Sequence, residues 1–289
     1  ARLSSGATIC ATGVPDMRYG ICNETFGDWP LKRACEFAAA CGYTGIEIAP
    51  FTLAGDPREL SAAERAELRR TIAQAGLDCI GLHWLLAKTE GFHVTDPDPT
   101  VRDRTVDYLG ELARLCHDLG GRILVFGSPQ QRSLLPGVAA EQAFGFLQDV
   151  FDRLVPALEA TDTVLALEPL SPIETDVLNT AADTCRLIEA IGSPHVKLHL
   201  DVKAMASEDL SIPEIIHASA AQLEHFHAND VNLQGPGFGA IEFGPIFQAL
   251  HDIAYSGWVS VEVFDYTPGA ERLARESIAY LQRVDEEIG

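Results

Sequence analysis

The order of its segments predicts that this chain is an α/β protein, a single closed (β/α)8 or TIM barrel. Short apolar segments alternate with longer amphipathic ones, and this pair of patterns occurs eight times. Alternating strands and helices give a parallel sheet, and eight such units close into a barrel within roughly 250 residues. The chain has 289 residues and no Pro- or Ser-rich segment that would divide it. We therefore expect one barrel domain over residues 17–289, preceded by a loose extension at residues 1–16.

Each expected strand is followed by an expected helix. The strands are expected in the apolar segments at residues 17–24, 44–50, 78–86, 122–127, 163–169, 195–201, 222–228 and 258–264. The helices are expected in the amphipathic segments at residues 28–42, 61–76, 99–121, 139–160, 179–192, 211–221, 244–254 and 269–284. Several of these helices stop at a glycine, which is a common way to end a helix: Gly42, Gly76, Gly120 and Gly192. An open doubly wound sheet is the alternative, but the first strand leads into YGICNETFGDW, which lacks a GxGxxG turn.

The long connections all follow predicted strands, whereas the connections that precede strands are short. We expect these long loops at residues 85–99, 128–138 and 230–244. In a parallel barrel they would gather on the rim at the carboxyl ends of the strands. That rim carries the active sites of such barrels, so we expect the functional residues there.

Charge and composition exclude several classes of partner. The chain has 21 basic and 42 acidic residues, a net charge of -21, which disfavours binding to nucleic acid or to anionic membranes. No apolar run approaches the roughly 20 residues that span a bilayer, and the opening segment lacks the pattern of a signal peptide. The seven cysteines show no CxxC pair, which is typical of reduced thiols. We therefore expect a cytoplasmic protein.

Strand alternation predicts a cluster of polar side chains inside the barrel. In VLALE, Leu165 and Leu167 share one face of the strand and Glu168 lies on the other. Because helices cover the outside of a barrel, the large aliphatic residues should face outward and Glu168 inward. The same alternation in VKLHLD, LEHFHA and WVSVEV gives four inward side chains at the ends of successive strands: Glu168, Asp201, His227 and Glu262.

These four side chains have the chemistry of a metal site. Three carboxylates that face one another repel strongly unless they are protonated or bind a cation. One imidazole with three carboxylates, and room for water or substrate oxygens, suits one octahedral divalent ion. We expect Mn²⁺ first, with Mg²⁺, Co²⁺ and Zn²⁺ as alternatives.

The same segments resemble the xylose-isomerase-like TIM-barrel superfamily of sugar isomerases and epimerases, over residues 17–286. The motifs that carry the resemblance are LALEPLSPIETD, LHLDVKAM, HFHANDVNLQGPGFGAIEF and GWVSVEVFDY. The chain is similar to ketose 3-epimerases and to inosose and hydroxypyruvate isomerases. The resemblance implies that Glu168, Asp201, His227 and Glu262 bind the metal and that Glu168 and Glu262 also transfer the proton. It also implies pairing of barrels into a homodimer or homotetramer.

The resemblance also implies substrate-binding positions, and the chain departs from them in part. Ketose 3-epimerases carry a Glu six residues after the first ligand, and Glu174 matches it. They carry a His three residues after the Asp ligand and an Arg six residues after the His ligand, where this chain has Ala204 and Leu233. Lys203 lies beside the first of these positions and could replace the missing histidine.

Further inward residues are candidates for substrate binding. His83 alternates with Cys79 and Gly81, so we expect all three to face inward; a substrate contact and a satisfied core histidine are both open for His83. Glu47 ends its strand inward, where an unpaired carboxylate is costly, which favours a functional role. Trp84 could pack on a sugar ring, as could Phe26, with ordinary packing as the alternative. We assign supporting or capping roles to three further residues: His225, Asn229 and Asp230. The role of His199 stays open.

The resemblance implies proton transfer next to a carbonyl group. A bound metal would polarise the carbonyl and stabilise an enediolate while a carboxylate removes and returns the proton. The predicted function is a metal-dependent isomerase or epimerase of a small sugar, sugar phosphate or keto-polyol. A lyase that dehydrates a keto-polyol or cyclic keto-acid on the same scaffold is the alternative. An endonuclease-like phosphodiesterase fits poorly with the single His ligand and the net charge, and a metal-free binding protein is the fourth alternative.

Overall fold

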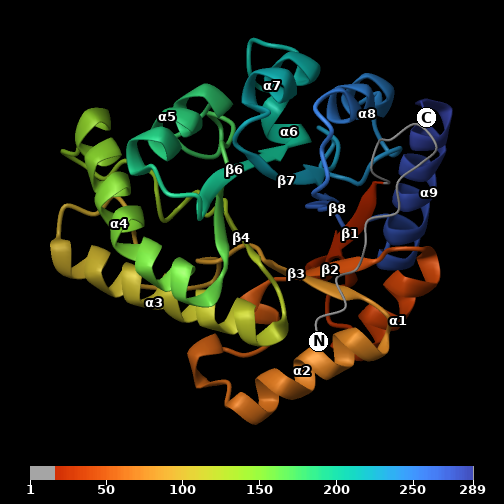
Figure 1. The fold of residues 1–289 in the computed structure, drawn as a ribbon, viewed down its shortest axis with the longest axis horizontal. Helices are drawn as coiled ribbons and strands as arrows, with labels where there is room; N and C mark the ends of the chain where they lie inside the picture. The colour runs from red at the N-terminus through yellow and green to blue at the C-terminus, as the bar shows by residue number, and fades with distance from the viewer. Residues whose placement is uncertain (1–16, 289) are drawn as a thin grey trace.

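A computed structural model describes residues 17–288, which form one closed barrel of parallel strands (Figure 1). Each strand pairs with the next along the chain, and β8 pairs with β1 to close the barrel. The predicted fold is therefore confirmed, while the expected extension at residues 1–16 lies outside the described residues. The strands are β1 Arg18–Cys22, β2 Gly45–Ile48, β3 Asp78–Leu82, β4 Ile123–Phe126, β5 Val164–Leu167, β6 Val196–Asp201, β7 Leu223–Ala228 and β8 Trp258–Val261.

Helices surround the barrel, as Figure 1 shows. They are α1 Leu31–Cys41, α2 Ala62–Gln74, α3 Pro99–Leu119, α4 Ala140–Thr161, α5 Ala181–Ile191, α6 Val202–Met205, α7 Ile212–Ser219, α8 Phe243–Asp252 and α9 Ala270–Ile288. Short 3-10 turns follow the first strands: η1 Asn23–Phe26, η2 Pro50–Thr52 and η3 Pro57–Glu59. Three of the predicted glycine stops are left-handed C-caps: Gly42, Gly120 and Gly192. The short α6, which begins directly after β6, was not expected.

Outer side chains between the helices and the barrel wall form most of the hydrophobic core. Leu165, Leu167 and the outward valines of β8 belong to this layer. A smaller cluster fills the barrel interior at the amino-terminal ends of the strands, and it consists of Ile80, Ile123, Val125, Val164, Ala166 and Trp258. The predicted facing of the fifth and eighth strands is confirmed. Because apolar side chains fill the amino-terminal end of the barrel interior, the carboxyl-terminal end is left for polar side chains.

One irregularity changes the expected facing in β3. Cys79 packs in the outer layer and Ile80 fills the interior, so the prediction that Cys79 faces inward was wrong. The register between β2 and β3 shifts after Cys79, and Glu47 pairs with Gly81. An extra residue in one strand reverses the alternation beyond it. Gly81 and His83 therefore regain the inward phase that the sequence predicted.

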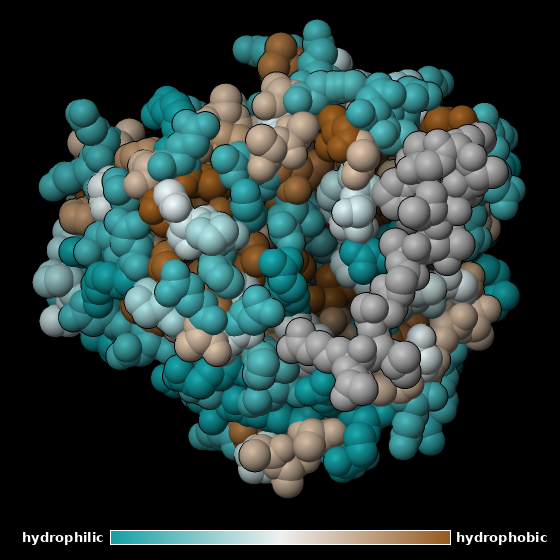
Figure 2. Space-filling model, in the orientation of Figure 1, coloured by the Kyte–Doolittle hydropathy of each residue, from teal (hydrophilic) through white to brown (hydrophobic). Residues whose placement is uncertain are grey.

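The long loops gather on one rim, as predicted. The backbone N–H of Val94 donates to the Gln131 carbonyl at 2.8 Å, which joins the loops after β3 and β4. Phe264 donates from its backbone to the Leu233 carbonyl at 2.8 Å, which joins the loop after β7 to the end of β8. Hydrophilic side chains cover most of the face in Figure 2, with apolar ones scattered among them. None of the helices between residues 17 and 288 is long and apolar enough to cross a bilayer.

Candidate active site and metal centre

The four predicted ligands meet at the carboxyl ends of neighbouring strands. Asp201 ends β6, His227 lies near the end of β7, and Glu168 and Glu262 directly follow β5 and β8. All four are buried. Possible ligand atoms of Asp201, His227 and Glu262 lie within 4.8 Å of one another, and those of Glu168, His199 and Asp201 form a second such group. Asp201 belongs to both groups and therefore lies close to each of the other three predicted ligands.

Hydrogen bonds on both sides orient the His227 ring. Its Nε2 lies 3.1 Å from Glu47 Oε1, and its Nδ1 lies 3.0 Å from Glu262 Oε2. Burial lowers the pKa of His227, but Glu47 and Glu262 outweigh it and leave the pKa well above its usual value. For Glu47, burial by itself raises the pKa, but the neighbouring His225 and His227 outweigh burial and hold the pKa well below its ordinary range. Glu47 thus holds Nε2 and leaves Nδ1 directed at the carboxylates, which is a common support for a metal-binding histidine.

The carboxylates of this group suit a divalent cation. Burial, and then Asp201 and Glu262, raise the pKa of Glu168 well above its usual value. The pKa of Asp201 is also raised, chiefly by burial. Two or more buried carboxylates that share a small volume are stable when a cation neutralises them. The donor set of three carboxylates and one imidazole therefore fits the metal that the sequence predicts.

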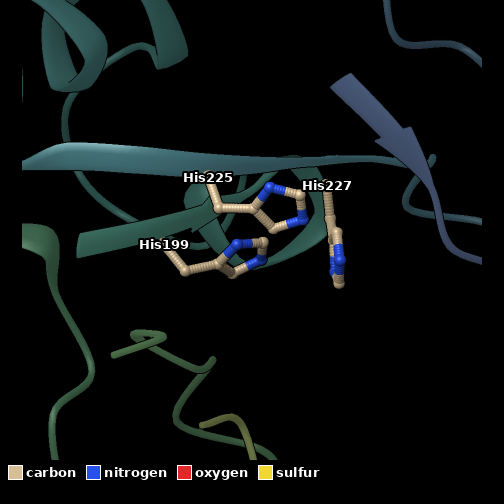
Figure 3. A group of neighbouring side chains, drawn as sticks. All are labelled: His199, His225 and His227. Carbon is tan, nitrogen blue, oxygen red and sulfur yellow. The ribbon is translucent and has the colours of Figure 1, made fainter. Parts of the chain in front are cut away.

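A second group of potential ligands lies deeper in the barrel. Figure 3 shows His199 on β6 beside His225 on β7, with both rings directed toward His227. All three are fully buried, and the ring centres of His199 and His227 lie 4.2 Å apart. Burial, with His227 and His225 nearby, lowers the pKa of His199 well below its usual value, so this ring is neutral. Neither His199 nor His225 lines the main cavities of residues 17–288, and both rings pack against His227, so we assign these two to its support rather than to substrate contact.

A cavity of about 490 Å³ opens above the carboxylates, and we call it the reaction cavity. Its volume is within the ordinary range for a site that binds a small molecule. Gly127 lines it, and a Cβ there would lie 2.0 Å from Glu168 Oε2, so only glycine leaves room for that carboxylate. The predicted residues that line the cavity are Glu168, Glu262, Glu174, Lys203 and Trp84.

Lys203 and Glu174 form an ion pair at the wall of the reaction cavity. The Lys203 Nζ lies 2.6 Å from Glu174 Oε1 and 4.4 Å from the centre of the Phe264 ring. Burial lowers the pKa of Lys203, but Asp201 and Glu174 raise it above the usual value. Both side chains are therefore charged, and they present several hydrogen-bonding atoms beside the carboxylates.

Two predicted substrate contacts, Glu47 and His83, do not reach this cavity. Glu47 is fully buried and lies 2.7 Å from His225 Nε2, as well as beside His227. His83 is also fully buried, and its Nε2 lies 2.6 Å from Glu24 Oε2. Hydrogen bonds to other side chains hold Glu47 and one ring nitrogen of His83, which favours a positioning role over substrate contact for both.

Three contacts around the site were not expected from the sequence. The Trp84 indole donates from Nε1 to Glu262 Oε1 at 2.7 Å, so this side chain holds a carboxylate as well as lining the cavity. Arg132 is fully buried and donates to the Glu168 carbonyl at 2.6 Å, while burial lowers its pKa to about 10. Glu24 holds His83. Glu24 lies two residues after the end of β1, inside the segment expected for the first strand, so the strand-end rule used for the ligands could have found it, whereas no sequence signal marks Arg132.

Comparison with known proteins agrees with this geometry. The xylose isomerase-like TIM-barrel family matches residues 35–284 of the chain. The chain belongs to this family. Among its relatives, a D-psicose 3-epimerase of Enterocloster bolteae is 28% identical over 261 residues, which is 87% of this chain and 83% of the relative. A 3-dehydro-D-guloside 4-epimerase of Escherichia coli is 24% identical over 276 residues, 92% of this chain and 99% of the relative.

Solved structures share the fold of this family member. A D-psicose 3-epimerase from Clostridium cellulolyticum superposes with a TM-score of 0.81 at 22% identity, covering 93% of this chain and 99% of that one. A 3-keto-D-glucoside 4-epimerase from Escherichia coli superposes with a TM-score of 0.80 at 22% identity, covering 93% and 100%. At this sequence identity the similarity shows the fold alone. The reaction of this xylose isomerase-like protein must therefore be argued from its own side chains.

Proposed function

We propose that the protein is a divalent-metal-dependent epimerase of a keto sugar, which inverts the carbon next to a ketone. One observation carries the proposal. Two buried carboxylates, Glu168 after β5 and Glu262 after β8, line the same cavity from strands that lie three positions apart around the barrel. Inversion needs one group to remove a proton and another to return it from the opposite side. The relatives named as psicose and guloside epimerases support this reaction class.

The metal in this proposal is held by Glu168, Asp201, His227 and Glu262. An oxygen-rich set with one imidazole favours Mn²⁺, and Mg²⁺ or Co²⁺ fit the same donors, with Zn²⁺ less well matched. When bound there, the cation supplies Lewis-acid polarisation of the substrate carbonyl, which makes the neighbouring C–H more acidic.

The chain's own residues carry the proton. Glu262 has one oxygen bonded to the Trp84 indole and the other beside His227, so its carboxylate is fixed in position. Glu168 lines the same cavity as Glu262, and buried Arg132 donates a hydrogen bond to the backbone carbonyl of Glu168. In the proposal, one of these carboxylates removes the proton on one face of the substrate and the other delivers a proton to the opposite face. The buried position of both excludes bulk water from the transfer.

The substrate in this proposal carries no phosphate. Phosphate sites use arginine forks, or the N–H groups of helix termini and nests. The reaction cavity has three carboxylates, from Glu168, Glu174 and Glu262, and two lysines, one of which is paired with Glu174. A neutral polyol chain fits this balance, because its hydroxyls can donate to Glu174 and accept from Lys203. That pair would take over the orienting role of the groups replaced by Ala204 and Leu233.

A substrate panel tests the proposed function. The purified protein, stripped with EDTA and reloaded with Mn²⁺, is incubated with ketohexoses and keto-glycosides in deuterated water. We expect deuterium at the carbon next to the carbonyl and a second epimer by NMR, and we expect both to disappear after chelation. Exchange that survives thorough chelation would reject the metal, and a dehydrated product absorbing in the ultraviolet would reject epimerisation in favour of a lyase.

Glu174→Gln should weaken substrate binding more than it slows the reaction. The variant removes the charge that pairs with Lys203, and Glu174 lies beside the cavity rather than among the metal-binding group. We expect KM to rise about tenfold to a hundredfold with kcat within about threefold, since a lost hydrogen bond to a charged group costs about 1.5–3 kcal/mol. Steady-state kinetics on the best substrate measure KM and kcat for this variant, and Glu36→Gln at an exposed position on α1 is the control. A loss in kcat with unchanged KM would contradict this role.

A further inference from the structure

A second cavity adjoins the reaction cavity on the same rim. It has a volume of about 820 Å³ and is lined chiefly by η1, η2 and the start of α9. The reaction cavity alone is large enough for a single sugar. The second cavity therefore offers room that a free monosaccharide would not need.

The two cavities share one aromatic wall. Trp84 and Lys88 line both of them. Phe51 lies on the second-cavity side, with its ring centre 5.9 Å from that of Trp84, and Phe264 stacks on the reaction-cavity side at 6.1 Å. The strip Phe51–Trp84–Phe264 therefore runs continuously from one cavity into the other. Aromatic faces of this kind hold the apolar faces of ligand rings.

The backbone at this junction is strained. Trp84 has a φ of 52°, in the left-handed region that non-glycine residues seldom adopt. Such conformations cluster at sites that clamp ligands, because the surrounding structure must maintain them. At this residue the Trp84 Nε1 donates to Glu262 while the indole also lines the second cavity, which places the ring between the reaction centre and the second cavity.

Two polar atoms in the second cavity lack partners among the described residues. Glu24 Oε1 and Thr25 Oγ1 are buried, and no residue among 17–288 hydrogen-bonds to either. Both residues are more than nine-tenths buried, and both line the second cavity. The other oxygen of Glu24 is held by His83, which fixes the carboxylate. Unpaired buried acceptors are costly, so they point to a ligand that brings hydroxyl groups.

Glu24 also connects the second cavity to the reaction centre. Its carboxylate belongs with Cys22, His83 and Glu262 to a group whose potential ligand atoms all lie within 4.8 Å of one another. A molecule bound to Glu24 is therefore a direct neighbour of one bound at Glu262. The charged residues beside it are mainly acidic, Glu24 and Asp28 against Lys88, which disfavours an anionic occupant.

We propose that the substrate is a keto sugar joined through a glycosidic bond to a second neutral, hydroxyl-bearing ring. The keto sugar lies in the reaction cavity, and the second ring lies in the second cavity against Phe51 and Trp84, with hydroxyls on Glu24 and Thr25. This inference rests on the proposed epimerase function and narrows its substrate to linked rather than free sugars. Binding energy from the second ring fixes the reacting carbon between the two carboxylates.

Matched substrate pairs test the inference. D-fructose and 3-keto-glucose are each supplied alone and joined to a glucose ring, with Mn²⁺-loaded protein in deuterated water. We expect the linked form to have a kcat/KM about tenfold or more above that of its free sugar, because remote binding energy raises turnover as well as affinity. Equal or better turnover of the free sugar overturns the inference but leaves the epimerase proposal standing. No exchange with any of the four sugars rejects both.

A pair of matched variants locates the second ring. Ala270 is the first residue of α9 and lines only the second cavity, and Ala140 is the first residue of α4 on a distant groove. Ala270→Trp should remove most of the advantage of the linked sugar, and Ala140→Trp should leave it intact. An advantage that survives Ala270→Trp would overturn the placement. If Ala270→Trp does not fold, calorimetric titration of the wild-type protein compares its affinity for the linked sugar with its affinity for the free sugar.

Discussion

Glu262→Gln should lose about two to four orders of magnitude in turnover, the usual contribution of a positioned general base or acid. The amide keeps the size of the carboxylate, and its oxygen can still accept the hydrogen bond from Trp84 Nε1 that the structure shows at 2.7 Å. The same oxygen can also coordinate a cation. The side chain therefore stays in place while its capacity to accept a proton is lost.

Two measurements separate this effect from loss of the metal. Exchange of the substrate's carbon-bound proton with deuterated water should fall together with turnover, while Mn²⁺ bound per protein stays close to one. Exposed Glu141→Gln, in the first turn of α4, should change neither value. Near-native turnover in the Glu262→Gln protein with metal bound would exclude Glu262 as the acid or base. The search would then move to Glu168 alone or to Lys203.

The strand-end residues could be predicted because they follow from two simple regularities. Side chains alternate along a strand, and a parallel barrel brings the carboxyl ends of successive strands to one rim. Glu168, Asp201, His227 and Glu262 obey both, so their convergence needed no knowledge of the packing. Lys203 lies two residues after Asp201 and Trp84 lies near the end of β3, whereas Glu174 was found through the family resemblance.

The roles of the residues beneath the site could not be predicted in the same way. Glu47 was expected to contact substrate, but its partner His225 lies 178 residues away in sequence, and only the closed barrel brings them together. Cys79 was placed on the wrong face because a bulge depends on the pairing of two strands. Arg132 lies in a loop, where no periodic pattern indicates which side chain becomes buried. Local regularity predicts positions, whereas hydrogen-bond partners depend on the assembled fold.

Glu168→Gln should slow turnover strongly and at the same time stabilise the metal-free protein. Burial and the neighbouring Asp201 and Glu262 raise the pKa of Glu168 well above its usual value, so its charged form is unfavourable in the absence of a cation. A neutral amide of the same shape removes that repulsion. If the relief is worth about 1 kcal/mol, the melting temperature of the EDTA-treated protein should rise by roughly 2–4 °C.

The metal should reverse this order of stability. A cation that binds only the folded state stabilises it in proportion to its affinity, and the wild-type protein offers one more carboxylate than the variant. Melting curves with and without Mn²⁺ should therefore show a larger upward shift for the wild type than for Glu168→Gln, while exposed Glu159→Gln on α4 behaves as wild type. Turnover in the variant should fall about a hundredfold to ten-thousandfold, as for Glu262. A variant that melts lower without metal, yet shifts as far as the wild type with Mn²⁺, would show that Glu168 is held by the chain itself and is not a ligand.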